Sequence, residues 1–189
     1  DNQERNNWSV TAHGGLNLSP GLEIQGKAGR GELEQKVIAY EHPHNGEELQ
    51  FDEESLGGKA TYTFPSGLYV SGEVLHRDFN SSRTNNSEMA YTIQTQVRPI
   101  LPLDLLLQYD HDMAPSALSV LEDITRNQMM AVGVLRLRDK GDASASLLRY
   151  DFSDDNKRDH ILLGTQWKIW ERTGMNVGVR YAYTTAKED

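Results

Sequence analysis

The sequence predicts an all-β fold, an antiparallel up-and-down meander of about ten long strands that forms a transmembrane β-barrel. The first observation is a period of two, in which apolar and polar side chains alternate along much of the chain. The second is that tight turns alternate with longer polar loops. Residues 1–189 are expected to be a single barrel domain or a segment of one.

The clearest hairpin spans His160–Thr184. Apolar and polar side chains alternate in two arms, which are separated by the turn Glu171–Gly174. Each arm has about ten residues, whereas strands of soluble sandwiches usually have about five or six. A tilted strand of about ten residues is long enough to cross a bilayer. This hairpin therefore indicates a membrane-spanning unit.

The same alternation predicts eight further strands. They run from Trp8 to Leu18, Leu22 to Ala28, Leu56 to Phe64, Leu68 to Leu75, Met89 to Arg98, Leu103 to Asp110, Gln128 to Arg138, and through an eighth segment that ends at Phe152. In the eighth, Leu147 and Leu148 break the alternation, which predicts a bulge that places Leu148, Tyr150 and Phe152 on the apolar face. Residues Ala117–Ile124 are expected to form one or two helical turns.

The connections are sorted by length. Tight turns follow the odd-numbered strands, as at Ser19–Gly21 and Pro65–Gly67. Longer polar loops follow the even-numbered strands, among them Arg77–Ser87, His111–Arg126 and Ser153–Asp159. Outer-membrane barrels separate short periplasmic turns from long extracellular loops in this way.

Between about Arg30 and Ser55 the alternation fails, and the role of this acidic stretch stays open. Val37–Tyr40 is either a strand extension beyond the membrane or a short extra strand. The first connection is short, so the first strand starts on the long-loop side, and the last strand ends on that side as well. We therefore expect an internal segment of a larger barrel, because an open sheet would leave unpaired edges in the bilayer.

Composition excludes several classes of protein. The mean hydropathy is -0.64, and no run of 18 apolar residues is present, so transmembrane helices are not expected. The chain has no cysteine, which excludes disulfides and thiolate metal sites. The net charge of -9 argues against binding of nucleic acid. No cofactor motif is present.

Aromatic residues near the strand ends are expected to lie at the membrane interfaces, as in the aromatic girdles of outer-membrane barrels. These residues are Trp8, Phe64, Tyr109, Trp167, Trp170 and Tyr183.

Polar residues that alternate with the apolar ones are expected to line a hydrated lumen and to hydrogen-bond a polar solute. These residues are His13, Glu23, Lys27, Glu73, Gln94, Gln96, Gln108, Asp110, Arg136, Gln166 and Arg180. Alternatively, they pair with one another across strands.

Two motifs could carry other chemistry. His42 and His44 resemble a two-histidine metal clip but lack a third ligand at a defined spacing. Asp110-His111-Asp112 resembles the acid/base group of an outer-membrane protease, yet successive side chains of a strand point to opposite faces. No nucleophile motif is found, so neither an enzyme nor a metal site is expected.

Segments such as Gly164-Thr165-Gln166-Trp167 and Gly178 to Tyr183, together with the strand lengths and the Pro/Gly turns, resemble the barrels of exopolysaccharide exporters of the tetratricopeptide-repeat porin family. The resemblance implies a barrel in the bacterial outer membrane and a periplasmic repeat domain in the same chain. It also implies export of a secreted polysaccharide through the lumen.

Three other functions stay open. One is a different outer-membrane barrel, such as a surface-protein assembly factor or a general porin. Another is a soluble lipocalin-like barrel, in which the apolar face would line a ligand cavity. The third, an outer-membrane protease or lipase, requires a catalytic constellation that the sequence does not contain. The expected partners are outer-membrane lipid and a polysaccharide or other polar solute, and not nucleic acid.

Overall fold

The computed structural model describes residues 5–36, 46–100, 102–114, 116–137, 140–170 and 175–187. In this part of the chain the protein is one antiparallel sheet with ten strands in the order of the sequence. The strands are β1 (Arg5–Ser19), β2 (Leu22–Lys36), β3 (Glu48–Thr63), β4 (Tyr69–Asn80), β5 (Asn85–Ile100), β6 (Leu103–Met113), β7 (Thr125–Arg136), β8 (Gly141–Phe152), β9 (Lys157–Trp170) and β10 (Met175–Lys187). One helix, α1 (Ala117–Leu121), lies between β6 and β7.

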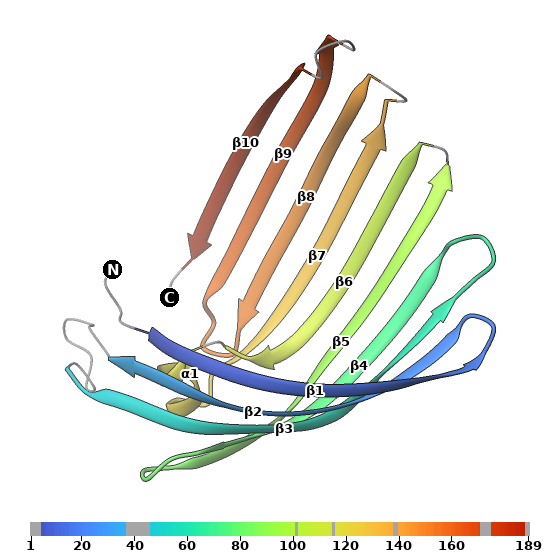
Figure 1. Cartoon of the computed structure of the whole chain (residues 1–189). Coiled ribbons are helices and arrows are strands. Elements are labelled where there is room, and N and C mark those ends of the chain that lie inside the picture. The colour runs from blue at the N-terminus through green and yellow to red at the C-terminus, as the bar shows by residue number, and fades with distance from the viewer. Residues whose placement is uncertain are drawn as a thin grey trace.

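The sheet curves into an open trough, in which β1–β3 form one wall and β7–β10 the other (Figure 1). Each strand pairs with its neighbour in the sequence, and among the described residues β1 and β10 form the two edges. The predicted all-β meander of ten strands is confirmed, and the described strands do not close into a barrel. The register shifts only near turns, at Asn17/Ser19, Val97/Ile100 and Met175/Asn176.

The pairing assigns every strand position to one of two faces, because paired residues share a face. Odd-numbered residues of β1–β4 and even-numbered residues of β5–β10 point to the concave face, as the pairs Lys59↔Glu73 and Thr92↔Asp110 illustrate. The alternate residues point to the convex face. Nearly all exposed large apolar side chains lie on the convex face, among them Ile93, Leu107 and Val179.

Several strands are longer than the sequence indicates. β2 and β3 stay paired from Leu22↔Tyr62 to Lys36↔Glu48, so most of the stretch from Arg30 to Ser55 belongs to strands. Val37–Tyr40 lies outside the described residues. The prediction of a loop from Arg77 to Ser87 was wrong, because β4 and β5 pair as far as Asn80↔Asn85.

The reason for this error is physical. A strand with polar side chains on both faces satisfies its backbone hydrogen bonds as well as an amphipathic strand does. In the sequence, such a strand has the composition of a loop. The charged loop expected at Ser153–Asp159 is shorter for the same reason, since β9 begins at Lys157.

The predicted bulge in the eighth strand was also wrong. β8 pairs with β7 and with β9 without a shift in register. Leu147 therefore points to the convex face, and Leu148, Tyr150 and Phe152 point to the concave face. A second apolar row on the inner face, rather than an extra residue, explains why Leu147 and Leu148 break the alternation.

The predicted helical turn is present as α1, and it contains part of the main apolar core. Ser116 is the N-cap, and its hydroxyl accepts a hydrogen bond from the backbone N–H of Ser119 (3.0 Å). The helix ends at Leu121 with Glu122 as its C-cap, and Asp123 follows with a positive φ of 56°. Ala117 and Val120 are buried against β2 and β3, so the segment lies on the concave face of the sheet (Figure 1).

Candidate functional site: the concave face

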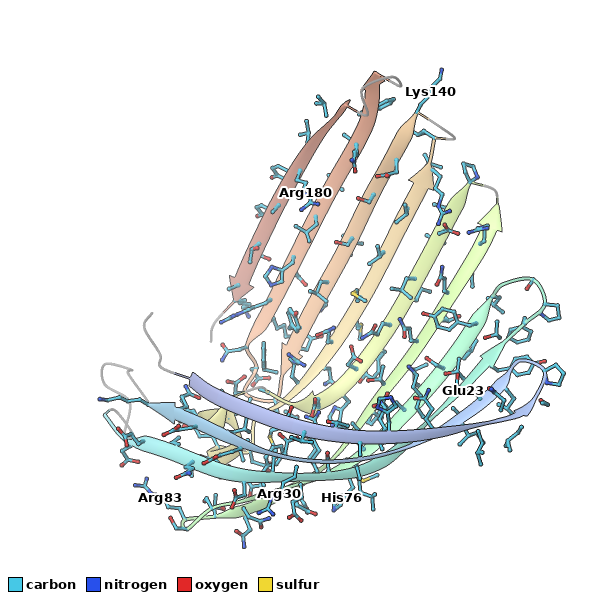
Figure 2. All side chains as sticks on the ribbon, in the orientation of Figure 1. Glu23, Arg30, His76, Arg83, Lys140 and Arg180 are labelled. Carbon is cyan, nitrogen blue, oxygen red and sulfur yellow. The ribbon has the colours of Figure 1, made fainter. Side chains whose placement is uncertain are left out.

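All the residues predicted to line a lumen lie on the concave face of the sheet. His13, Glu23, Lys27 and Glu73 are odd-numbered positions of β1, β2 and β4. The others are even-numbered positions of β5, β6, β7, β9 and β10: Gln94, Gln96, Gln108, Asp110, Arg136, Gln166 and Arg180. By contrast, Arg30 and His76 lie on the outer side of the curved sheet (Figure 2).

The centre of this face carries a polar row that runs across four strands. Glu73, Thr92, Asp110 and Gln128 are successive Cα partners on β4, β5, β6 and β7. The Asp110 carboxylate accepts hydrogen bonds from Thr92 Oγ1 (2.7 Å), Gln108 Nε2 (2.7 Å) and Gln128 Nε2 (3.1 Å). Three donors on one carboxylate fix the orientation of these side chains.

An ion pair continues the row on one side, and a cation–π contact continues it on the other. Lys27 on β2 reaches across β3 to pair with Glu73 on β4. On the far side, the guanidinium of Arg126 lies 5.5 Å from the ring centroid of Tyr150. Some members of the row therefore pair across strands, which the sequence had left open as an alternative to solute contact.

A buried charge cluster lies nearer to the long-loop end of the concave face. Arg77 Nη1 donates to both carboxylate oxygens of Asp112, at 2.7 and 2.8 Å. Its Nε is 3.6 Å from Glu53 Oε1. Glu88 on β5 is the Cα partner of Arg77, and its Oε1 is 3.5 Å from Nε2 of His111, a convex-face position of β6. The cluster joins four consecutive strands, β3 to β6, through charged side chains.

Two of the three acids of this cluster, Glu88 and Asp112, lie beyond the apolar runs of their strands, Met89–Val97 on β5 and Leu103–Tyr109 on β6. Burial raises the pKa of the Glu88 carboxyl, and the negative charge of Asp112 raises it further. Burial also raises the pKa of Asp112, although the neighbouring Arg77 guanidinium opposes this rise. The protein therefore keeps these charges partly out of water at an energetic cost.

The charge cluster borders two cavities of about 320 Å³ each. Leu75, Arg77 and Asp112 line both of them. The first lies between the helix-containing connection and β1–β4, and the second extends over β4–β7 and includes Asp110. Space of this size beside charged and amide side chains can hold water or part of a polar solute.

The predicted interface aromatics lie on the other face where the structure describes their side chains. Tyr109, Trp167 and Tyr183 are convex-face positions, and Trp167 and Tyr183 are about half exposed. Phe64 follows β3 and packs edge-on against Tyr62, with ring centroids 4.6 Å apart. The side chains of Trp8 and Trp170 lie outside the described part of the structure.

The side chains of the Asp110-His111-Asp112 motif do not converge on one face. Asp110 and Asp112 point to the concave face, whereas His111 stacks on Tyr91, with ring centroids 4.9 Å apart, and contacts Asn127. His42 and His44 lie outside the described residues. In the part of the chain that the structure describes, no group of three or more His, Asp or Glu side chains could hold a metal ion.

The sequence missed Glu53, Arg77, Glu88, Asp112 and Arg126 as residues of the concave face. They lie where the strands extend beyond the bounds that the alternation predicts. Continuing the period of two past the apolar runs would have placed Arg77 on the same face as Glu73.

No protein-family model, curated protein or solved structure matches this chain. None of the helices in the described ranges has the length and apolar character needed to cross a membrane.

Proposed function

We propose that the sheet is part of the wall of a β-barrel in the bacterial outer membrane. The barrel is a channel whose lumen is lined by the concave face, and a secreted polysaccharide is exported through it. The convex face contacts lipid, and the aromatic residues Phe64, Tyr109, Trp167 and Tyr183 lie at the membrane interfaces.

The division of side chains between the two faces is the observation that carries this proposal. On β2 the convex face is apolar from Leu22 to Ala28 and then carries Arg30, whose side chain is 66% exposed. Seven residues at about 3.3 Å each span about 23 Å. The apolar band of outer-membrane barrels is about 25 Å tall, so the match supports a lipid-facing surface.

The sheet edges support a larger, closed assembly. β1 and β10 have one unpaired side each among the described strands, and unpaired backbone groups are not tolerated in the hydrocarbon core of a bilayer. Strand pairing at these two edges would complete the barrel.

The character of the inner face supports a polar solute. Lys27, Glu73, Gln108 and Asp110 offer charges of both signs and amide groups, which suit the hydroxyl, amide or amine groups of a sugar chain. In a soluble lipocalin-like barrel, the apolar side chains would face inward instead. The choice of a polysaccharide over another polar solute rests on the resemblance of the sequence to exopolysaccharide exporters.

Ion selectivity in planar bilayers tests the proposal. Glu73→Lys and Asp110→Lys each reverse a charge on the concave face and should shift the selectivity of the channel toward anions. Glu54→Lys is the matched control, because Glu54 lies on the convex face with its side chain 61% exposed. If the two concave-face variants behave like the control, these residues do not line a pore.

A simpler measurement separates the membrane assignment from a soluble fold. The protein should aggregate when detergent is removed, since its convex face exposes a continuous apolar surface. A folded, monodisperse protein without detergent would exclude the outer-membrane proposal.

A second test separates export of a polysaccharide from passage of small ions alone. A soluble fragment of a partly deacetylated glucosamine polymer should block the open channel from one side at concentrations where dextran of the same length does not, because the lumen carries Glu73 and Asp110. Equal lack of block by both polymers would leave a general porin as the better assignment.

A further inference from the structure

We infer that the segment Ser116–Ile124, called the α1 segment from here on, is a fixed constriction that narrows the lumen and limits the width of the solute. This inference rests on the proposed function, because it requires that the concave face encloses a lumen.

The α1 segment is held by the most buried side chains of the described structure. Val120 is 1% exposed, and it packs with Phe51 of β3 (1%) and Phe79 of β4 (2%). On β1–β5 the rest of the concave face carries mainly polar side chains and glycines. An apolar cluster on a polar wall has a physical reason only if something covers it, and the α1 segment provides this cover.

Polar contacts fix the position of the α1 segment. The side-chain amide of Asn86 on β5 donates a hydrogen bond to the backbone carbonyl of Val120. The backbone N–H of Leu118 donates to Gln35 Oε1 on β2 (3.5 Å). Ser116 caps the N-terminus of the helix, so the backbone N–H of Ser119 finds its hydrogen-bond acceptor within the segment. Anchors on two separate strands argue for one defined position.

The path of the chain places the α1 segment inside the trough, where it narrows the lumen. It leaves the sheet at the end of β6, contacts β2 and β3, and returns to the start of β7. The segment therefore lies several strands away from its attachment points and across the interior of the trough (Figure 1). A solute that passes along the concave face must go around it.

The two ends of the α1 segment allow a clean deletion. The backbone N–H of Ala114 donates to the carbonyl of Ile124 (2.9 Å), so β6 and β7 are still paired where the segment begins. Replacing residues 115–123 with Asn-Gly would close the hairpin with a two-residue turn. The matched control replaces residues 81–84 with Asn-Gly, since Asn80 and Asn85 are partners at the same end of the sheet.

Single-channel conductance in planar bilayers is the readout. Deletion of the α1 segment should raise the conductance by about twofold or more, and the control should leave it unchanged. Channels of equal conductance in wild type and deletion would overturn the constriction while leaving the proposed function intact. If the wild-type protein forms no channel at all, the proposed function fails and the constriction fails with it.

A cross-linked variant keeps the inference testable if the deletion does not fold. The chain has no cysteine, so Asn86→Cys with Val120→Cys introduces the only two thiols. Oxidation should join them readily, and the oxidised channel should conduct as the reduced one does, because the segment is already in place. A conductance that changes on oxidation would contradict a fixed constriction.

Discussion

Gly57 shows how one residue permits the close pairing of two strands. It lies on the concave face of β3 opposite Leu75, and a Cβ placed there would be 2.0 Å from the carbonyl oxygen of Val74. Only glycine allows the backbones of β3 and β4 to approach this closely. The close pairing of β3 and β4 at this point therefore depends on a missing side chain.

Substitution of Gly57 by alanine should lower the free energy of unfolding by about 1–3 kcal/mol, because the backbone must shift to accommodate the methyl group. Unfolding in urea from detergent micelles measures this change. Gly72→Ala on β4 is the control, since a Cβ at Gly72 meets nothing within 4 Å. Equal stability of the two variants would mean that β3 and β4 are less closely packed than the structure shows.

At the scale of single elements, the β6–β7 connection differs from an irregular loop because it contains the helix α1. Its helix is short and has no charged residue in its first turn or basic residue in its last. Helices of this length are marginal in isolation. Its stability therefore comes from burial of Ala117 and Val120 against the sheet.

Phe79→Ala tests this dependence. Phe79 is 2% exposed in the apolar cluster, and its truncation should cost about 3–5 kcal/mol and release the α1 segment. Hydrogen exchange of the Ile124 amide, which donates to the Ser119 carbonyl (2.8 Å), should accelerate. In the control His76→Ala, which removes a convex-face side chain of the same strand, exchange should stay slow. Unchanged exchange in Phe79→Ala would show that the cluster does not hold the segment.

At the scale of the whole molecule, the two faces of the sheet define two environments. The convex face combines a continuous apolar surface with charged residues such as Arg30 and Glu54 at the long-loop end. The concave face combines the polar row, the charge cluster and the α1 segment. In the proposed barrel, lipid covers the convex side and removes this apolar surface from water.

Arginine substitutions on β5 distinguish lipid from water at the convex face. Ile93→Arg should lower the stability in lipid bilayers by about 2–4 kcal/mol, the cost of a cation near the bilayer midplane. Ser87→Arg, on the same face but beyond the apolar run, should have little effect. Because Ile93 is 55% exposed in the sheet, its substitution would be harmless if that face contacted water. Unfolding in urea from phospholipid vesicles gives both values.

The period of two by itself determined the strands, their order and which residues share a face. His13, Asp110 and Arg180 could be assigned to one face from the sequence because side chains of a strand alternate whatever the sheet does. The same rule failed at Leu147 and Leu148, where both faces are apolar, and at Arg77–Ser87, where both are polar. Alternation carries no information when the two faces have the same character.

Only the tertiary structure decided what meets across the trough. The contact of Val120 with Phe51 and Phe79 and the ion pair of Arg77 with Asp112 join residues that are 35 or more positions apart. No local pattern encodes such contacts, because they depend on the curvature of the sheet (Figure 1). The sequence therefore specified the two faces of the wall, and the fold decided what covers the inner one.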